Sequence, residues 1–190
     1  MNVVRRLVLV VLAGVLALGV SAADAADPVT PETYGDAMRW YRTEAENGYP
    51  RAQYLFGYMH EIGHGATRDA AIARDWYARA AAQGEPRAQY RLAGLYHRGQ
   101  GGPPDLAEAV RWYRAAAERN HAGAQSMLGY LFAAGEGVAR DDVQAYLWLT
   151  LAAEGGDIGA ADNLERLTPG LAPEQIATGK ALVEAWSPNP

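Results

Sequence analysis

Two histidines and a glutamate form the most suggestive chemical motif in this sequence. His60, Glu61 and His64 follow the H-E-x-x-H spacing within the segment MHEIGH. On one continuous helix the histidines would lie one turn apart and could bind zinc, while the glutamate activated the metal-bound water. The spacing therefore admits a metal-dependent hydrolase, provided that the fold keeps all three residues on one helix.

The first residues have the pattern of a secretory signal peptide. Two arginines precede an apolar run from Leu7 to Val20, and small residues follow in SAADAAD. The run is shorter than the roughly 20 residues that a helix needs to span a bilayer. We predict a signal peptide over residues 1–25, cleaved after Ala25 or alternatively after Ala22, and a flexible segment over residues 26–32. The expected location is the bacterial periplasm or the exterior, with no membrane insertion after removal of the signal.

Charge and composition exclude several functions. The chain has 17 Lys and Arg against 22 Asp and Glu, and removal of the predicted signal leaves 15 against 21. A surface with this acidic excess repels phosphate backbones and anionic lipid heads, so nucleic acid and membranes are not expected as partners. The absence of cysteine excludes disulfides and thiol catalysis. Neither serine of the mature chain lies in a G-x-S-x-G or S-x-x-K motif.

A regular repeat occupies most of the remaining chain. Trp40, Trp76, Trp112 and Trp148 are spaced 36 residues apart, within WYRTEAENG, WYARAAAQG, WYRAAAERN and WLTLAAEGG. The segments AQYLFGYMHEIGHG, AQYRLAGLYHRGQG and AQSMLGYLFAAGEG recur with the same period. Such a period is typical of stacked helix pairs, each of which buries its apolar side against its neighbours.

Each repeat is predicted to contain a helix A, a glycine turn and a helix B. Helix B should begin after an aspartate that accepts hydrogen bonds from first-turn amides and should end at a residue that tolerates the left-handed conformation. The aspartates are Asp69, Asp105 and Asp141, and the end residues are Gly48, Gly84, Asn120 and Gly156. We expect the tryptophans of the series, with Tyr41, Tyr77 and Tyr113, to fill the core between adjacent helix pairs.

These motifs resemble the Sel1-like repeats, a subclass of the tetratricopeptide-like solenoids. The shared features are A-x-x-x-L-G, the G-x-G turn, the opening aspartates, W-Y and A-A-x-x-G, and they extend from Thr33 to about Leu167. The resemblance implies an all-α fold, namely a right-handed alpha-solenoid of antiparallel helix pairs. It also implies an adaptor without catalytic activity that binds a protein or peptide partner in a concave groove.

The repeat register defines the expected organisation of the chain. A repeat array over residues 33–168 is followed by a C-terminal capping helix and a fraying tail over residues 169–190. The array comprises a lone helix over residues 33–50, repeats over 51–86, 87–122 and 123–158, and a partial unit over 159–168.

The same register argues against the metal site. His60 aligns with aromatic residues inside helix A of the other repeats, whereas His64 aligns with residues of the turn. Because Gly63 is predicted to end the helix, the two histidines would not share one face. We predict no catalytic residue, no metal ligand and no cofactor. A hydrolase acting through His60, Glu61 and His64 is the least favoured alternative.

Helix A residues away from the packing stripe are the candidate partner contacts, because their i, i+4 and i+7 spacing places them in one line. These candidates are Tyr54, Tyr58, Glu61, Tyr90, His97 and Tyr130. For Tyr54 and Tyr90, packing between repeats is the alternative role. The expected partner is a protein or peptide of the cell envelope. The main alternative is a cell-wall glycan or muropeptide, which an exported groove containing tyrosines would also suit.

Overall fold

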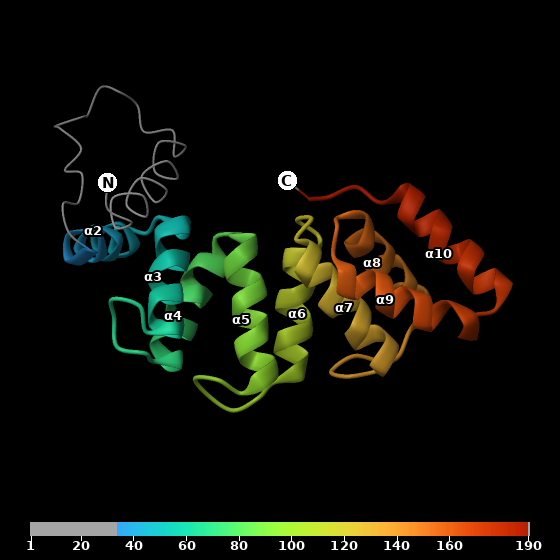
Figure 1. The fold of residues 1–190 in the computed structure, drawn as a ribbon, viewed down its shortest axis with the longest axis horizontal. Coiled ribbons are helices and arrows are strands. Elements are labelled where there is room, and N and C mark those ends of the chain that lie inside the picture. The colour runs from blue at the N-terminus through green and yellow to red at the C-terminus, as the bar shows by residue number, and fades with distance from the viewer. Residues whose placement is uncertain (1–33, 190) are drawn as a thin grey trace, which may run out of the picture. The chain divides into compact units, whose positions relative to one another are not determined.

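The computed structural model describes residues 34–189, so the predicted signal peptide and the segment that follows it lie outside the described residues. In the described part, all regular structure is helical, and no helix is long and apolar enough to cross a bilayer. The chain divides between Trp40 and Tyr41 into two units. In the second unit, consecutive helices pack side by side in chain order (Figure 1). The predicted all-α array of helix pairs is confirmed.

The helices alternate between the two predicted types. The A helices are α3 (Pro50–Ile62), α5 (Pro86–Arg98), α7 (Ala122–Ala134) and α9 (Ile158–Leu167). The B helices are α2 (Tyr34–Glu46), α4 (Ala70–Ala82), α6 (Leu106–Ala117) and α8 (Asp142–Glu154). After α9, a short 3-10 turn, η1 (Thr168–Gly170), leads to α10 (Pro173–Ala185).

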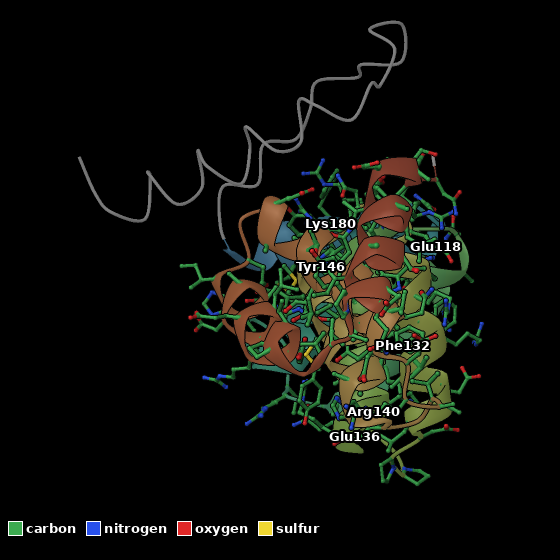
Figure 2. All side chains as sticks on the ribbon, turned by 90° about the vertical axis from the view of Figure 1, so that its right-hand side faces the viewer. Glu118, Phe132, Glu136, Arg140, Tyr146 and Lys180 are labelled. Atoms are coloured by element: carbon green, nitrogen blue, oxygen red, sulfur yellow. The ribbon has the colours of Figure 1, made fainter. Side chains whose placement is uncertain are left out.

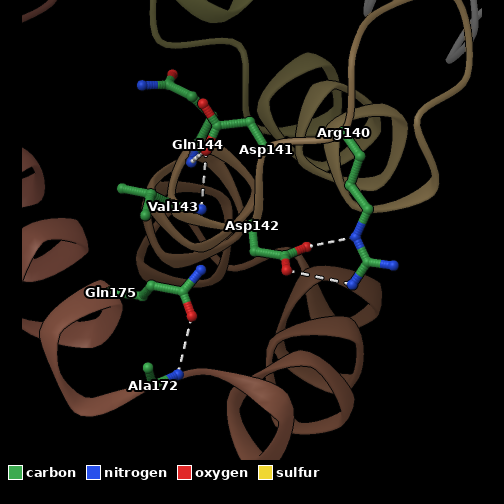
Figure 3. Close-up of polar contacts among 7 residues, drawn as sticks. All are labelled: Arg140, Asp141, Asp142, Val143, Gln144, Ala172 and Gln175. Carbon is green, nitrogen blue, oxygen red and sulfur yellow. Dashed lines mark hydrogen bonds and ion pairs between the residues drawn. The ribbon is translucent and has the colours of Figure 1, made fainter.

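The predicted ends of the B helices are confirmed. Asp69 accepts hydrogen bonds from the backbone amides of Ala71 and Ile72 at 2.8 and 3.0 Å. Asp105 and Asp141 cap α6 and α8 in the same way, as Figure 3 shows for Asp141. These carboxylates supply the acceptors that first-turn amides lack within a helix. Positive φ angles occur at the predicted end residues, Gly48, Gly84, Asn120 and Gly156.

Close contact between the A and B helices depends on a small residue in each A helix. A Cβ atom added at Gly57 would lie 3.0 Å from the ring of Tyr77, and one added at Gly129 would lie 2.7 Å from Leu149. The corresponding residue of α5 is Ala93, which is completely buried. A large helix B side chain therefore packs directly against the helix A backbone.

The tyrosines contribute more to the core than the tryptophans do. Tyr77 and Tyr113 are 0% and 2% exposed, whereas Trp76 and Trp112 are only half-buried. The guanidinium groups of Arg79 and Arg111 lie 4.4 and 4.1 Å from the ring centroids of these two tryptophans. Of the four tryptophans in the series, only Trp148 is fully buried, with 4% of its surface exposed. The prediction that the whole tryptophan series lies in the core is therefore only partly correct.

Buried glutamines join consecutive repeats. Each side-chain amide donates to a backbone carbonyl near the end of the preceding B helix, as a second donor beside the backbone amide three residues further on. The pairs are Gln53 with Ala45 at 3.1 Å, Gln89 with Ala81 at 3.2 Å and Gln125 with Ala117 at 3.2 Å. The glutamine of the recurring A-Q dipeptide is thus a structural part of every complete repeat.

The array ends because α9 cannot accept a B helix in the usual place. Glu165 is exposed and occupies the position where the other A helices have glycine or alanine. A glutamate side chain there would block the close approach that Gly57 and Gly129 permit. The next helix, α10, packs instead against α8.

Helix α8 carries two leucines whose burial is consistent with the packing of this terminal helix. Leu147 and Leu151 are buried, although the aligned residues of α4 are the exposed Asp75 and Arg79. Gly179 of α10 is also buried, and a Cβ atom there would lie 2.5 Å from the ring of Tyr146. Figure 2 views this end of the molecule and labels Tyr146 of α8 together with Lys180 of α10. The start of α10 is stabilised by Gln175, whose side chain accepts from the Ala172 amide at 2.9 Å (Figure 3).

The last described residues contact the array, and the predicted fraying of the tail stays a prediction. The Asn189 amide donates to the carbonyl oxygen of Glu118 at 2.7 Å, and its side chain donates to the Glu118 carboxylate at 3.3 Å. Trp186 is half-buried and packs against the core cluster that surrounds α7 and α8. The tail therefore connects α10 to the end of α6.

Candidate partner-binding surface

The structure separates the two histidines of the H-E-x-x-H motif. Helix α3 ends at Ile62, and Gly63 adopts the left-handed conformation with a φ of 76°. His64 lies beyond this residue, so the register argument is confirmed. His60 Nδ1 lies 3.1 Å from the carbonyl oxygen of Thr67. Among the described residues, no group of three or more histidine, aspartate or glutamate side chains is arranged to hold a metal ion.

The six candidate contacts lie on three consecutive A helices. Helix α3 carries Tyr54, Tyr58 and Glu61, helix α5 carries Tyr90 and His97, and helix α7 carries Tyr130. We call these six residues the A-helix surface. Five of them are half-buried, and Tyr130 is 42% exposed. The structure arranges them in two groups, one around Glu61 and one between α5 and α7, where His97 and Tyr130 lie near Glu136 and Tyr90 stacks on His121.

Glu61 is held in place by a tyrosine from the core. The Tyr77 hydroxyl donates to Glu61 Oε2 at 2.6 Å, although Tyr77 belongs to helix α4. Burial of Tyr77, together with the hydrogen bond to Glu61 and its negative charge, raises the pKa of this tyrosine well above its usual value. The hydroxyl therefore stays protonated and remains a donor. The Glu61 side chain is only 15% exposed.

Two arginines from helix α5 share the same carboxylate. Arg91 Nη1 lies 3.6 Å and Arg98 Nη2 lies 4.0 Å from Glu61 Oε1. The Arg91 guanidinium also lies 5.1 Å from the centroid of the Tyr58 ring, which stacks on Tyr54 at 6.4 Å. The carboxylate, the arginines and the tyrosines thus form one continuous cluster across α3 and α5.

Sequence reasoning missed three members of this cluster. Tyr77 was assigned to the core, and its side chain does lie there, but its hydroxyl reaches the surface carboxylate. Arg91 had a detectable signal, because the aligned residues Leu55 and Met127 are apolar. Arg98 is the last residue of α5, and a basic residue in the last turn of a helix is too common to be a distinctive signal.

The second group lies around α5 and α7. His97 Nε2 lies 3.9 Å from Glu136 Oε2, and the Tyr130 hydroxyl donates to Glu136 Oε1 at 3.4 Å. The Tyr90 ring stacks on His121, with 4.6 Å between centroids. The ring centroid of Tyr54 lies 5.8 Å from that of the buried Tyr77, and the same distance separates Tyr90 from Tyr113. These contacts agree with the packing role considered for Tyr54 and Tyr90.

His121 is the N-cap of helix α7, and its ring acts there as a hydrogen-bond acceptor. Its Nδ1 accepts a hydrogen bond from the Ala124 amide at 3.2 Å. Burial lowers the pKa of His121, a hydrogen bond with its own backbone opposes this shift in part, and the positive charges of Arg87 and Arg91 lower the pKa further. Burial and the arginine charges both favour the neutral ring that the cap requires.

Sequence comparison identifies the repeat. The family model for the Sel1 repeat matches residues 50–85, 86–121 and 122–157, which together cover more than half of the chain. The chain belongs to the Sel1 repeat family. Sel1 repeats generally form scaffolds for protein–protein interaction, and proteins built from them are typically not catalytic.

Solved Sel1 structures share this architecture. A Sel1 repeat protein from Oxalobacter formigenes is 40% identical, with a TM-score of 0.66 over 69% of this chain and 54% of that one. A protective antigen of uropathogenic Escherichia coli that displays an SLR fold is 30% identical, with a TM-score of 0.74 over 81% of this chain and 33% of that one. The chain thus spans about half and about a third of these relatives.

A more distant structure shows the fold alone. Cysteine rich protein B of Helicobacter pylori is 20% identical, with a TM-score of 0.56 over 70% of this chain and 98% of that one. No curated protein sequence matches the chain significantly.

Proposed function

We propose that this protein is an exported, non-catalytic scaffold that binds a protein or peptide segment through the A-helix surface. The observation that carries the proposal is the line of half-exposed tyrosines beside a Glu61–arginine cluster on consecutive A helices. Membership of the Sel1 repeat family supports the same class of partner. The signal-like residues at the start of the chain support a location in the cell envelope.

The composition of this surface suits a protein partner. Tyrosine and arginine are enriched among the residues that contribute most to protein interfaces. Here the rings are already ordered by stacking and by a cation–π contact, as shown by the Tyr54–Tyr58 stack and by Arg91 over Tyr58. Ordered side chains lose little conformational entropy on binding, so more of the contact energy is retained as affinity.

Export is tested by mass spectrometry of the protein purified from cell fractions. The proposal expects a mature protein in the envelope or the medium that begins at Ala26, or at Ala23 if the alternative site is used. An intact chain that starts at Met1 in the cytoplasm would contradict export.

Partner binding is tested by capture from envelope extracts with the mature chain and two matched variants. Tyr58→Ala removes a ring of the A-helix surface, whereas Tyr49→Ala removes a tyrosine that is 58% exposed outside it. We expect a protein that is retained by the wild type and by Tyr49→Ala but lost with Tyr58→Ala, and that binds directly when purified. Circular dichroism shows whether both variants remain folded. Retention of glycan fragments, with no protein, would favour the cell-wall alternative.

A further inference from the structure

Positive charge beside the A-helix surface is concentrated on helix α5. Helix α5 contains Arg87, Arg91 and Arg98 and no acidic residue, although the chain as a whole has a net charge of −5. Residues four and eleven apart lie on one face of a helix, so the three arginines share a face of α5. Helix α7, by contrast, contains no charged residue.

The arginine pair near Glu61 is incompletely neutralised. Two guanidinium groups face one carboxylate, and their distances of 3.6 and 4.0 Å exceed the roughly 3 Å of a direct hydrogen bond. The side chains of Arg91 and Arg98 are 36% and 52% exposed. A ligand can therefore reach both groups and form the short, charge-assisted hydrogen bonds that Glu61 does not form with them.

Gly94 provides space beside these arginines. It lies in the middle of α5, where the aligned residues of α3 and α7 are Tyr58 and Tyr130. A Cβ atom at Gly94 would lie 3.0 Å from Arg98 Nη1, so the guanidinium lies directly over the helix backbone. Glycine inside a helix is destabilising relative to alanine. Here it leaves room for the Arg98 guanidinium, which a side chain at position 94 would contact.

We propose that Arg91 and Arg98 bind a carboxylate of an acidic peptide segment, and that Glu61 neutralises them when no partner is present. This inference rests on the proposed function, because it assigns partner chemistry to the A-helix surface. The planar guanidinium group matches a carboxylate through two parallel hydrogen bonds. An extended polyanion such as nucleic acid is disfavoured, since the acidic excess of the chain would repel it.

The arrangement gives Glu61 a distinctive role. Tyr77 holds one carboxylate oxygen, so Glu61 stays beside the arginines and competes with an incoming carboxylate. Loss of the Glu61 charge should therefore strengthen the binding of an acidic peptide, whereas loss of either arginine should weaken it. Structural damage alone would weaken binding in every variant.

The test uses a display library of random dodecapeptides selected on the full mature chain. Selected peptides are then synthesised with their Asp and Glu residues intact or replaced by Asn and Gln, and binding is measured by fluorescence polarisation. The variants are Arg91→Gln, Arg98→Gln and Glu61→Gln. Arg111→Gln and Glu108→Gln are matched controls, because these two residues form an exposed ion pair on α6 at 2.7 Å.

We expect peptides rich in Asp and Glu whose affinity falls about tenfold or more with each of Arg91→Gln and Arg98→Gln. The amide versions of the peptides should lose a similar factor, Glu61→Gln should bind more tightly, and the α6 controls should bind like the wild type. Arg98→Gln keeps the test decisive if Arg91→Gln fails to fold, since Arg98 is the more exposed of the pair.

Two other outcomes separate the failure of this inference from the failure of the proposed function. Neutral or basic peptides that depend on Tyr58 but not on Arg91 or Arg98 would overturn the acidic specificity and leave the scaffold function intact. Recovery of no peptide at all would count against both proposals. Peptides that bind Arg98→Gln and Arg111→Gln equally well would also overturn the inference.

Discussion

The hydrogen bond between Tyr77 and Glu61 connects the core to the candidate surface, and its removal should measurably destabilise the protein. Tyr77→Phe keeps the buried ring but deletes the donor that lies 2.6 Å from the carboxylate. A hydrogen bond to a charged group contributes about 1.5–3 kcal/mol. Because Arg91 and Arg98 still face Glu61 in this variant, we expect a loss near the lower end, about 1.5–2 kcal/mol.

A double-mutant cycle with Glu61→Gln measures the part of this hydrogen bond that depends on the charge of Glu61. Glu61→Gln keeps an oxygen that can accept from Tyr77 but removes the negative charge beside the arginines. If the two residues interact as the distance indicates, the double variant should lose about 1 kcal/mol less than the sum of the single losses. Urea unfolding followed by circular dichroism at 222 nm gives the three free energies. A repeat array can unfold in parts. The dependence of the unfolding free energy on urea concentration must therefore be the same in all variants before their free energies are compared.

Tyr113→Phe provides the matched control. Tyr113 occupies the same position one repeat later, but the residue aligned with Glu61 there is His97. The hydroxyl of Tyr113 therefore has no equivalent carboxylate, and its loss should cost well under 1 kcal/mol. Equal losses in Tyr77→Phe and Tyr113→Phe would refute the view that Tyr77 positions Glu61. A coupling energy near zero would show that the charge of Glu61 does not strengthen the hydrogen bond.

Three further predictions follow from the packing. Burial lowers the pKa of His121 from 6.5, so the stability that its neutral ring contributes should be present above pH 6.5 and lost as the pH falls below it. The urea midpoint of the wild type should therefore fall in mild acid, and that of His121→Asn, which keeps a capping residue that does not titrate, should fall less. Gly179→Ala should press a methyl group against Tyr146 and destabilise the packing of α10 by about 1–3 kcal/mol. Hydrogen exchange should then become faster in α10 alone, and unchanged exchange would show that the helix tolerates the contact. Tyr113→Ala should cost about 3–5 kcal/mol in urea unfolding and Trp112→Ala clearly less, since only the tyrosine is fully buried; the reverse order would contradict the burial described above.

The sequence predicts the helix boundaries well because they depend on local chemistry. An aspartate cap needs only its own first-turn amides, and a left-handed residue needs only its own backbone freedom, so Asp69 and Gly84 act as the pattern indicates. The burial of the tryptophans depends on distances between helices. Period alone cannot distinguish Trp112, which contacts solvent, from Tyr113 beside it, which does not.

The packing of the terminal helix against α8 has a signal in the sequence that our prediction did not use. Leucines at 147 and 151 stand where the aligned residues of α4 are Asp75 and Arg79, and this change indicates that something covers α8. Glu165 likewise replaces the small residue that a B helix requires. Together these substitutions predict that the helix after α9 returns to α8. The attachment of Asn189 to Glu118 has no comparable pattern, since it joins residues 71 apart by two polar contacts.

The candidate surface was only partly predictable because its chemistry comes from both helices of each repeat. In the first repeat, the helix B residue that packs on Gly57 is Tyr77, and its hydroxyl supports Glu61. In the second repeat, the aligned pair is Tyr113 and His97, whose rings lie 6.4 Å apart.

The third repeat has lost both polar members of this pair. Leu149 packs on Gly129 where the other repeats have a tyrosine, and the aligned helix A residue is Ala133. A leucine cannot donate a hydrogen bond, so no polar residue at position 133 would be supported from the core. The interior residue of each repeat therefore sets which side chain its surface can hold. A partner that extends along the array would meet charge on α3 and α5, and then the exposed ring of Tyr130 on the uncharged α7.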